Sequence, residues 1–370
     1  MADMTDPDWV PAIRIASAVV TNRGGRTCHA AIVSRELGVP CIVGSKDATE
    51  RLKTGETYTI DCSKGNQAYV YSGTADIVRT DIDTSDLPVT KTKIQLILGD
   101  PDAALSHASL PVAGVGLTRQ EFVVANHIGI HPNAVLEPEL VKEDEWALIT
   151  EKAVNDASPE AFFIRMLAEG VGSIGAAFYP RPIIVRLGDF KSNEYCRLIG
   201  GMGFEPNEEN PMIGLRGASR YLHPNFKESF KLECRALLYV RKQMGLDNVH
   251  LMVPFCRTPE EGKGVIETLA EQGLIQGEDG LKIWVMCEIP SNVLAVDEFA
   301  EIFDGFSIGS NDLTQLVLGV DRDSSELTNL FDESNIAVKR AIKLAIQGAH
   351  RHNRPIGLCG QAPSGKQNVI

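Results

Sequence analysis

The stretch Phe306-Ser307-Ile308-Gly309-Ser310-Asn311-Asp312-Leu313-Thr314-Gln315 contains the pattern from which the fold can be predicted. A short apolar run ends in glycine and polar residues, and a helical stretch follows it. Strands of a parallel sheet end in this way where the chain turns into a crossover helix. We therefore expect a strand at 306–308 with polar side chains at its carboxyl end.

The same pattern recurs from Lys93 onward, with apolar runs alternating with helical stretches. The runs are Ile94–Leu98, Gly114–Leu117, Ile183–Leu187, Val249–Val253, Ile283–Met286, Phe306–Ile308 and Ile356–Leu358. Alternation of this kind predicts a parallel sheet. About seven strands in series predict an α/β fold, a (β/α)8 barrel of the TIM type that lacks its last strand.

Reactive side chains follow these runs, and a barrel gathers the carboxyl ends of its strands at one mouth. They are Arg119, Arg186, Glu288, Asn311, Asp312 and Cys359, with Gly309 and Ser310 adjacent, Arg216 on a long connection and Arg322 beyond the last carboxylate. Each residue alone suits a surface ion pair or a buried thiol. Together, two carboxylates can hold Mg²⁺ with open positions, and arginines offer two-pronged donors to a phosphoryl group or a carboxylate.

A second candidate site lies near the N-terminus, in Thr21-Asn22-Arg23-Gly24-Gly25-Arg26-Thr27-Cys28-His29. The glycines allow close approach of the backbone, and Thr27 is a candidate N-cap for a helix whose first N–H groups would face an anion. Arg23, Arg26 and Arg35 add positive charge. A histidine at a helix start more often makes a structural hydrogen bond, but a neutral imidazole in this setting can carry a phosphoryl group.

The chain divides by composition into two units and a linker. Residues 1–80 suit a small α/β unit, with strands near 19–21 and 41–43 around the histidine helix and a hairpin that turns at 63–66. Residues 81–92 continue a polar stretch and form the linker, and residues 93–370 form the barrel. The motif Gly170-Val171-Gly172-Ser173-Ile174-Gly175 follows a helical segment rather than a strand, so we do not expect it to bind a dinucleotide.

Composition restricts the classes of partner. Hydrophobic residues make up 44% of the chain and charged residues 23%, as in ordinary globular proteins. The net charge of −13 argues against nucleic acid, so an anionic substrate needs a local arginine cluster. The eight cysteines are scattered without metal-binding spacing, which suits a reducing cytoplasm. We see no signal peptide and no apolar run long enough for a membrane span.

Several strings taken together resemble the phosphoenolpyruvate-utilising (PEP-utilising) enzymes, and among them the phosphoenolpyruvate synthases (pyruvate, water dikinases). They are Thr27-Cys28-His29, Val185–Tyr195, Glu205–Pro211, Met286–Asn292 and Phe306–Gln315. The resemblance covers nearly the whole chain and implies a small swivelling phosphohistidine domain followed by a barrel that binds PEP and pyruvate.

The resemblance also implies a role for each position. His29 would carry the phosphoryl group, and Cys359 would exchange a proton at the substrate methyl carbon. Glu288 and Asp312 would bind Mg²⁺. The substrate would contact Arg119, Arg186, Arg216, Glu288, Gly309, Ser310, Asn311, Asp312 and Arg322. Proton removal by Cys359 needs a thiolate, so we expect the arginine-rich mouth to lower the pKa of this thiol.

Compared with that family, the chain is expected to be a fragment or one half of a split enzyme. It lacks the ATP-grasp domain, the first strands of the phosphohistidine domain and the end of the barrel. ATP would then act only through a missing domain or a partner chain, and the chain alone would run only the half-reaction between PEP and His29. Barrels of this class are often dimeric, so the resemblance also implies a homodimer.

Three alternatives remain open. Enzyme I of the sugar phosphotransferase system shares both domains, but it usually has serine where this chain has Cys28, and it lacks the string Phe190–Tyr195. Pyruvate, phosphate dikinase matches the same strings less well. An inactive remnant that only binds PEP or pyruvate is the alternative from outside the enzymes, although every expected catalytic side chain is present.

Overall fold

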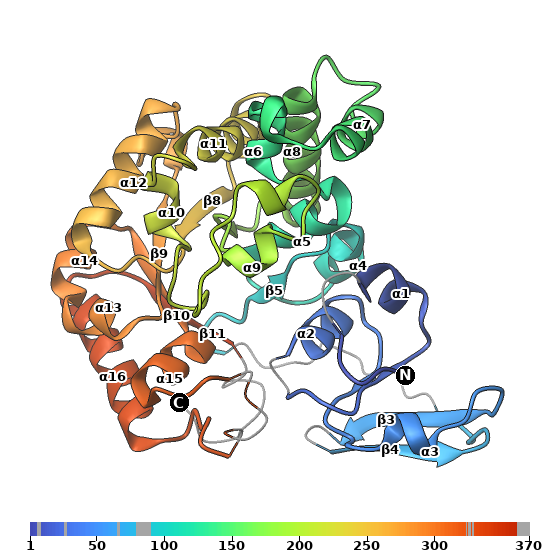
Figure 1. Ribbon diagram of the computed structural model, residues 1–370. Coiled ribbons are helices and arrows are strands. Elements are labelled where there is room, and N and C mark those ends of the chain that lie inside the picture. The colour runs from blue at the N-terminus through green and yellow to red at the C-terminus, as the bar shows by residue number, and fades with distance from the viewer. Residues whose placement is uncertain are drawn as a thin grey trace.

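The computed structural model describes residues 1–5, 9–25, 28–64, 67–78, 90–322, 324, 327 and 329–360. A small N-terminal unit lies beside a large barrel unit, and the two have separate sheets (Figure 1). The described residues thus show the predicted mixed α/β architecture. The boundaries at 80 and 92 stay predictions, because most of the expected linker lies outside the described residues.

The N-terminal unit contains two small sheets. Its elements are α1 (Val10–Ile15), β1 (Val19–Val20), α2 (His29–Glu36), β2 (Cys41–Ile42), α3 (Ala48–Arg51), β3 (Tyr58–Lys64) and β4 (Gln67–Ser72). Strands β1 and β2 pair in parallel, and β3 and β4 form an antiparallel hairpin. Val10, Ile13, Val19 and Val33 form a small core that joins α1, β1 and α2.

Two details of this unit differ from the prediction. Helix α2 begins at His29 with Cys28 at the N-cap position, one residue later than the expected cap at Thr27, which lies outside the described residues. The hairpin strands run further than expected and leave only residues 65–66, which are not described, between them. Helix α2 ends at Glu36, and Gly38 shortly after it has a φ of +68°, which favours glycine.

Seven parallel strands form the barrel sheet, and each pairs with its neighbour in sequence. They are β5 (Leu96–Leu98), β6 (Val115–Arg119), β7 (Ile183–Arg186), β8 (Val249–Val253), β9 (Ile283–Cys287), β10 (Gly305–Gly309) and β11 (Ile356–Cys359). Each apolar run of the sequence forms one of these strands. The prediction of a TIM-type barrel one strand short is therefore confirmed, although β5 begins two residues later than its run.

The sheet curls so far that its ends approach one another. Side chains from five strands meet in its interior, and they are Leu117, Ile184, Met252, Met286 and Cys359. Because the first comes from β6 and the last from the edge strand β11, the barrel is nearly closed (Figure 1).

Helices cover the outside of the barrel (Figure 1). The longer ones are α7 (Glu143–Lys152), α8 (Pro159–Phe178), α11 (Lys227–Lys242), α12 (Pro259–Glu271), α14 (Val296–Ile302), α15 (Ser310–Leu318) and α16 (Ile336–Arg351). The shorter ones are α4 (Ala104–Ala108), α5 (Glu121–Val123), α6 (Pro132–Leu136), α9 (Ser192–Tyr195), α10 (Ala218–Leu222) and α13 (Pro290–Leu294). Single 3-10 or π turns occupy Pro101–Ala103, Val124–Ile128, Pro138–Leu140, Gly201–Gly203 and Glu278–Gly280.

Helix α8 contains the Gly-x-Gly-x-x-Gly motif in its interior, so the expected absence of a dinucleotide loop there is confirmed. Its glycines serve close packing, since a Cβ on Gly170 would lie 2.6 Å from Val123 and one on Gly172 would lie 2.5 Å from Met244. By length and composition α8 could cross a membrane, which corrects the prediction that no apolar run is long enough. A core helix passes the same test, and α8 buries one face against its neighbours.

Within the described residues, Arg14 and Phe122 contribute contacts between the two units. Arg14 of α1 contacts Asp102 with an Nη1–Oδ2 distance of 2.9 Å and Asp100 with an Nη2–Oδ2 distance of 3.5 Å. Phe122 of α5 packs against the core of the N-terminal unit.

Candidate active site at the barrel mouth

Alternation along the strands explains why charged side chains reach the mouth. Successive side chains of a strand point to opposite faces, so residues two apart share a face. Arg186 lies two positions after the interior residue Ile184, and Arg119 lies two positions after Leu117, which is also interior. On both strands, the interior side chain is therefore apolar, and the next side chain on the same face is an arginine at the mouth.

Arg186 is held by two carboxylates. Its Nη2 lies 2.9 Å from Glu121 Oε1, and its Nη1 lies 3.1 Å from Asp189 Oδ2. The backbone N–H of Asp189 donates to the same Glu121 oxygen at 2.7 Å. These contacts fix the guanidinium of Arg186 and the turn after β7 as one unit.

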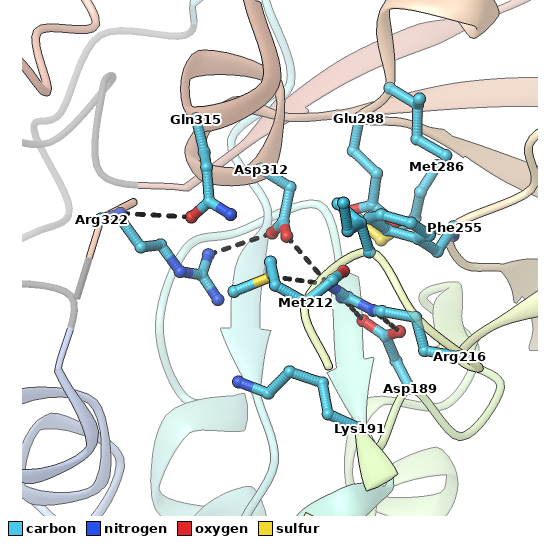
Figure 2. A network of polar contacts seen from close by, with 12 residues as sticks. Asp189, Lys191, Met212, Arg216, Phe255, Met286, Glu288, Asp312, Gln315 and Arg322 are labelled. Atoms are coloured by element: carbon cyan, nitrogen blue, oxygen red, sulfur yellow. Dashed lines mark hydrogen bonds and ion pairs between the residues drawn. The ribbon is translucent and has the colours of Figure 1, made fainter. Parts of the chain in front are cut away.

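Arg216 is the most enclosed arginine of the site, with 3% of its surface exposed. It donates from Nε and Nη2 to the two oxygens of Asp189, at 3.0 and 2.7 Å, and from Nη1 to Asp312 Oδ1 at 3.2 Å. Its guanidinium carbon lies 4.0 Å from the ring centroid of Phe255 (Figure 2). A planar cation held on an aromatic face and on two carboxylates is rigid before any ligand arrives.

Asp312 joins two of the predicted arginines. Its second oxygen accepts from Arg322 Nη1 at 3.0 Å (Figure 2). Burial opposes ionisation of Asp312, but the charges of Arg322 and Arg216 outweigh it and hold the pKa of this carboxyl well below its usual range. Asp312 is therefore an anion at neutral pH.

Glu288 has the opposite electrostatic character. It is 1% exposed, and its Oε1 accepts from the backbone N–H of Phe255 at 2.8 Å. Burial and then the negative charge of Asp312 raise the pKa of Glu288 above its usual range. The site thus contains one carboxylate that is firmly charged and one whose charge is costly without a further cation.

The turn from β10 into α15 needs a small residue and provides polar atoms. A Cβ on Gly309 would lie 2.6 Å from Glu288 Oε2, so a side chain there would displace the carboxylate. Ser310 donates to Glu333 Oε1 at 2.8 Å. The buried Asn311 Oδ1 has no hydrogen-bond partner among the described residues, which leaves it able to bind a ligand or an ion.

Cys359 ends β11 inside the barrel. Its thiol donates to the carbonyl of Ile308 with an Sγ–O distance of 3.2 Å and accepts from Ser307 Oγ at 3.5 Å. Burial raises the pKa of Cys359, whereas Arg186 and Arg119 act in the opposite direction without overcoming it. The expectation of a lowered pKa is therefore wrong for this structure, because burial destabilises the thiolate more than the positive charges of the arginines stabilise it.

His29 lies in the other unit, at the first position of α2, as predicted. Gly24 before it has a φ of +113°, and a Cβ there would lie 2.8 Å from Cys28 Sγ, so the turn needs glycine. Arg23 pairs with Asp3 rather than standing alone. Arg26 lies outside the described residues.

The structure thus brings Arg186, Arg216, Asp312 and Arg322 into one network, with Glu288 beside it. Sequence reasoning missed Glu121 and Asp189, which hold Arg186 and Arg216. It also missed Lys191, whose side chain is 16% exposed and whose Nζ lies 3.1 Å from Glu194 Oε1. This side chain extends along the mouth toward the side where Arg322 lies (Figure 2). The available signal was the position of Asp189, three residues beyond Arg186 at a strand end.

One group of possible metal ligands lies elsewhere in the described part of the chain. The ligand atoms of Asp100, Asp102 and His127 lie within 4.8 Å of one another. Arg14 already pairs with both carboxylates. The group therefore serves the contact between the two units, and it does not coincide with the predicted metal ligands.

The fold and the site define a parallel α/β-barrel protein with an arginine-rich mouth and a small histidine-bearing unit N-terminal to the barrel. Residues 76–370 match the family model of the PEP-utilising enzyme PEP-binding domain. Residues 1–65 match that of the PEP-utilising enzyme mobile domain. The chain belongs to the PEP-utilising enzyme family.

Similar proteins are named phosphoenolpyruvate synthase. Identity is 56% with the protein of Synechocystis sp., 54% with that of Deinococcus radiodurans and 52% with that of Escherichia coli, each over 98% of this chain. The matches cover 45%, 47% and 46% of those proteins, so the chain spans about half the length of the curated relatives it matches. A solved aldolase/citrate lyase family protein from Burkholderia cenocepacia covers 73% of this chain and 80% of its own, with a TM-score of 0.39 and 14% identity, a likeness too low to support an argument.

Proposed function

We propose that this chain is the phosphoryl-transfer and PEP/pyruvate-binding part of a phosphoenolpyruvate synthase (pyruvate, water dikinase). The whole enzyme would convert ATP, pyruvate and water into AMP, PEP and phosphate through a phosphohistidine. ATP would act through a part outside this chain or through a partner chain, and a homodimer in the cytoplasm is the expected assembly. The observation that supports the proposal most is the preformed network of Arg186, Arg216, Arg322 and Asp312 at the mouth of a barrel that belongs to this family.

The arginines would bind the two acidic groups of PEP. Arg216 is fixed by Asp189 and Asp312, whereas the side chain of Arg322 is 15% exposed and contacts Asp312 through Nη1. Its Nε is buried and has no partner among the described residues. We assign Arg216 to orientation of the phosphoryl group and Arg322 and Arg119 to contacts that form when the substrate enters, since preorganised donors cost nothing to reorganise during the reaction.

The residues present fit a divalent cation. Glu288 and Asp312 are buried carboxylates whose mutual repulsion a cation would relieve, and the partnerless Asn311 Oδ1 is a third oxygen of the kind Mg²⁺ binds. Glu288 and Asp312 would hold Mg²⁺. When bound there, the ion would supply positive charge that stabilises developing negative charge on substrate oxygens.

The remaining chemistry belongs to His29 and Cys359. In the direction from PEP, the imidazole of His29 attacks phosphorus, the bond from phosphorus to the enol oxygen breaks, and the enolate of pyruvate remains in the barrel. The enolate then takes a proton at its terminal carbon from the thiol of Cys359, which becomes a thiolate. The raised pKa of Cys359 supports this assignment, because a protonated thiol is the form this direction requires. In the reverse direction the thiolate removes the same proton.

Intact-mass spectrometry after incubation with PEP and Mg²⁺ tests the proposal. We expect an acid-labile gain of one phosphoryl group in the chain and no gain in His29→Ala, which should still bind PEP. The variant His107→Ala, which changes a half-buried histidine of α4 in the barrel unit, is the matched control and should be phosphorylated like the wild type. No gain in a folded sample that binds PEP would refute transfer by this chain and favour a PEP-binding role alone.

A further inference from the structure

The turn that follows β7 is held by two hydrogen bonds to Gly188. The N–H of Gly188 donates to Glu233 Oε1 at 3.1 Å, and the carbonyl of Gly188 accepts from the Tyr221 hydroxyl at 2.6 Å. Glu233 comes from α11 and Tyr221 from α10, and both side chains are buried. Both backbone polar groups of one glycine are therefore held by side chains from two different helices.

This glycine stands between two residues of the site. Arg186 precedes it by two positions and Asp189 follows it directly, and Asp189 holds Arg216. The glycine also has little room, because a Cβ there would lie 3.2 Å from Glu233 Oε2. A shift of the Glu233 carboxyl would therefore move the peptide that sets the direction of Asp189.

The groups that face Glu233 are neutral or negative. Gln120 hydrogen-bonds to it, Glu121 acts on it through its charge, and the hydroxyls of Tyr195 and Tyr221 lie near it, with the Cys234 thiol next to it in sequence. Burial raises the pKa of Glu233 to about 8, although the hydrogen bonds from Gln120 and Gly188 oppose the shift. The carboxyl is thus an uncharged acceptor at pH 7 and becomes charged at mildly alkaline pH.

We propose that Glu233 is a positioning residue, which acts through the Gly188 peptide to hold Arg186 and Asp189 in the geometry that binds PEP. Ionisation of Glu233 places a negative charge beside Glu121, whose Oε1 accepts from both Arg186 and the N–H of Asp189. Repulsion between the two carboxylates then loosens that junction. The inference rests on the proposed function for its kinetic consequence, but the fastening of the turn does not.

The test compares Glu233→Gln, which keeps an acceptor for the Gly188 N–H and cannot ionise, with Glu233→Leu, which removes the acceptor. Glu228→Gln, an exposed carboxyl on the same helix, is the matched control. Hydrogen exchange of the peptide that covers 186–190, followed by mass spectrometry, reports the fastening directly. We expect exchange about tenfold faster in Glu233→Leu than in the wild type and unchanged exchange in Glu233→Gln and in the control, since one buried hydrogen bond is lost in the leucine variant alone.

Kinetics of PEP-dependent phosphorylation at His29, measured from pH 6 to pH 9, report the positioning. We expect the KM for PEP of the wild type to rise above about pH 8 and that of Glu233→Gln to stay level there. The leucine variant should show a KM about tenfold higher at pH 7 with a smaller change in kcat. Equal exchange in all variants, or the same alkaline rise of KM in the wild type and Glu233→Gln, would overturn the inference.

The outcomes separate this inference from the proposed function. A wild type that binds PEP without phosphorylation of His29 refutes the transfer reaction, and the exchange measurement still decides the role of Glu233. If Glu233→Leu does not fold, the comparison of the wild type with Glu233→Gln decides through the pH dependence of exchange. Above about pH 8, exchange in the wild type and in the control Glu228→Gln should rise relative to exchange in Glu233→Gln.

Discussion

Asp189 accepts two hydrogen bonds from Arg216, from Nε to Oδ1 at 3.0 Å and from Nη2 to Oδ2 at 2.7 Å. One of these oxygens also lies 3.1 Å from Arg186 Nη1. A single buried carboxylate therefore sets the distance and angle between two arginines that come from a strand end and from a long connection. Pairing of this kind matters more for orientation than for net stability, because burial of the charges offsets much of their attraction.

Replacement of Asp189 by asparagine should damage both binding and stability. The amide keeps one acceptor but turns an NH2 group toward a guanidinium, and it leaves the buried Arg216 with Asp312 as its remaining ion pair. Loss of one partner of a buried pair costs about 3–5 kcal/mol, which we expect in the free energy of unfolding by urea. The KM for PEP should rise by at least about tenfold. Asp297→Asn, an exposed acid that pairs with Arg351, should leave both quantities near wild type; an unchanged KM in Asp189→Asn would contradict a role in substrate binding.

Replacement of Asp312 by asparagine should weaken the dependence of PEP binding on Mg²⁺. The change removes the carboxylate that is charged at neutral pH and leaves Glu288, whose raised pKa favours its neutral form. We expect the apparent Kd for Mg²⁺, titrated calorimetrically in the presence of PEP, to rise by about 10- to 100-fold, as metal sites do when a carboxylate ligand or its support is lost. Glu298→Gln, an exposed acid of α14, is the control. A titration identical to the wild type would remove Asp312 from the predicted ligands.

Replacement of Cys359 by alanine should abolish exchange of the pyruvate methyl protons with solvent while pyruvate still binds. Exchange requires the thiolate, and burial raises the pKa of this thiol, so in the wild type the exchange rate should increase as the pH rises from 7 to 9. Deuterium uptake into pyruvate, followed by NMR, measures the rate. Cys256→Ala, a buried thiol that hydrogen-bonds to Thr258, should exchange normally. Persistent exchange in Cys359→Ala would assign the proton transfer to another group.

The sequence predicts the barrel well because local patterns determine its strands. Apolar runs that alternate with helical stretches mark the strands, and the alternation of side chains places Arg186 and Arg119 on the interior face. For the same reason the motif at 170–175 could be set apart from dinucleotide loops, because a helical segment and not a strand precedes it. These conclusions need no knowledge of long-range contacts.

The parts that could not be predicted depend on residues that are distant in sequence. Glu121 holds Arg186 from 65 positions away, and Glu233 reaches Gly188 across 45 positions. The direction of the pKa shift of Cys359 depends on its burial, which no local pattern gives. The cap of α2 differs by one residue because cap positions are the least certain part of a helix.

Replacement of Arg14 by alanine should loosen the contact between the two units without disturbing either. The pair with Asp102 is exposed on both sides, and such pairs contribute at most about 1 kcal/mol. Asp100 is buried, but its contact with Arg14 is longer, with an Nη2–Oδ2 distance of 3.5 Å, and its Oδ1 still accepts from the N–H of Asp102 at 3.0 Å. We expect a larger radius of gyration in small-angle X-ray scattering and an unchanged unfolding midpoint for the barrel. Phe122→Ala, which removes the apolar contact, should have a similar effect.

The same change also separates transfer between the units from chemistry within the barrel. If His29 must approach the mouth, Arg14→Ala should slow its phosphorylation by PEP, while deuterium exchange into pyruvate, which needs only Cys359 and the barrel, should keep its wild-type rate. The double variant Arg14→Asp with Asp102→Arg reverses the pair and should recover part of the lost transfer rate, as a charge pair measured in a double-mutant cycle does. A change of similar size in both reactions would mean that Arg14 supports the barrel itself, because Asp100 and Asp102 form its first turn after β5.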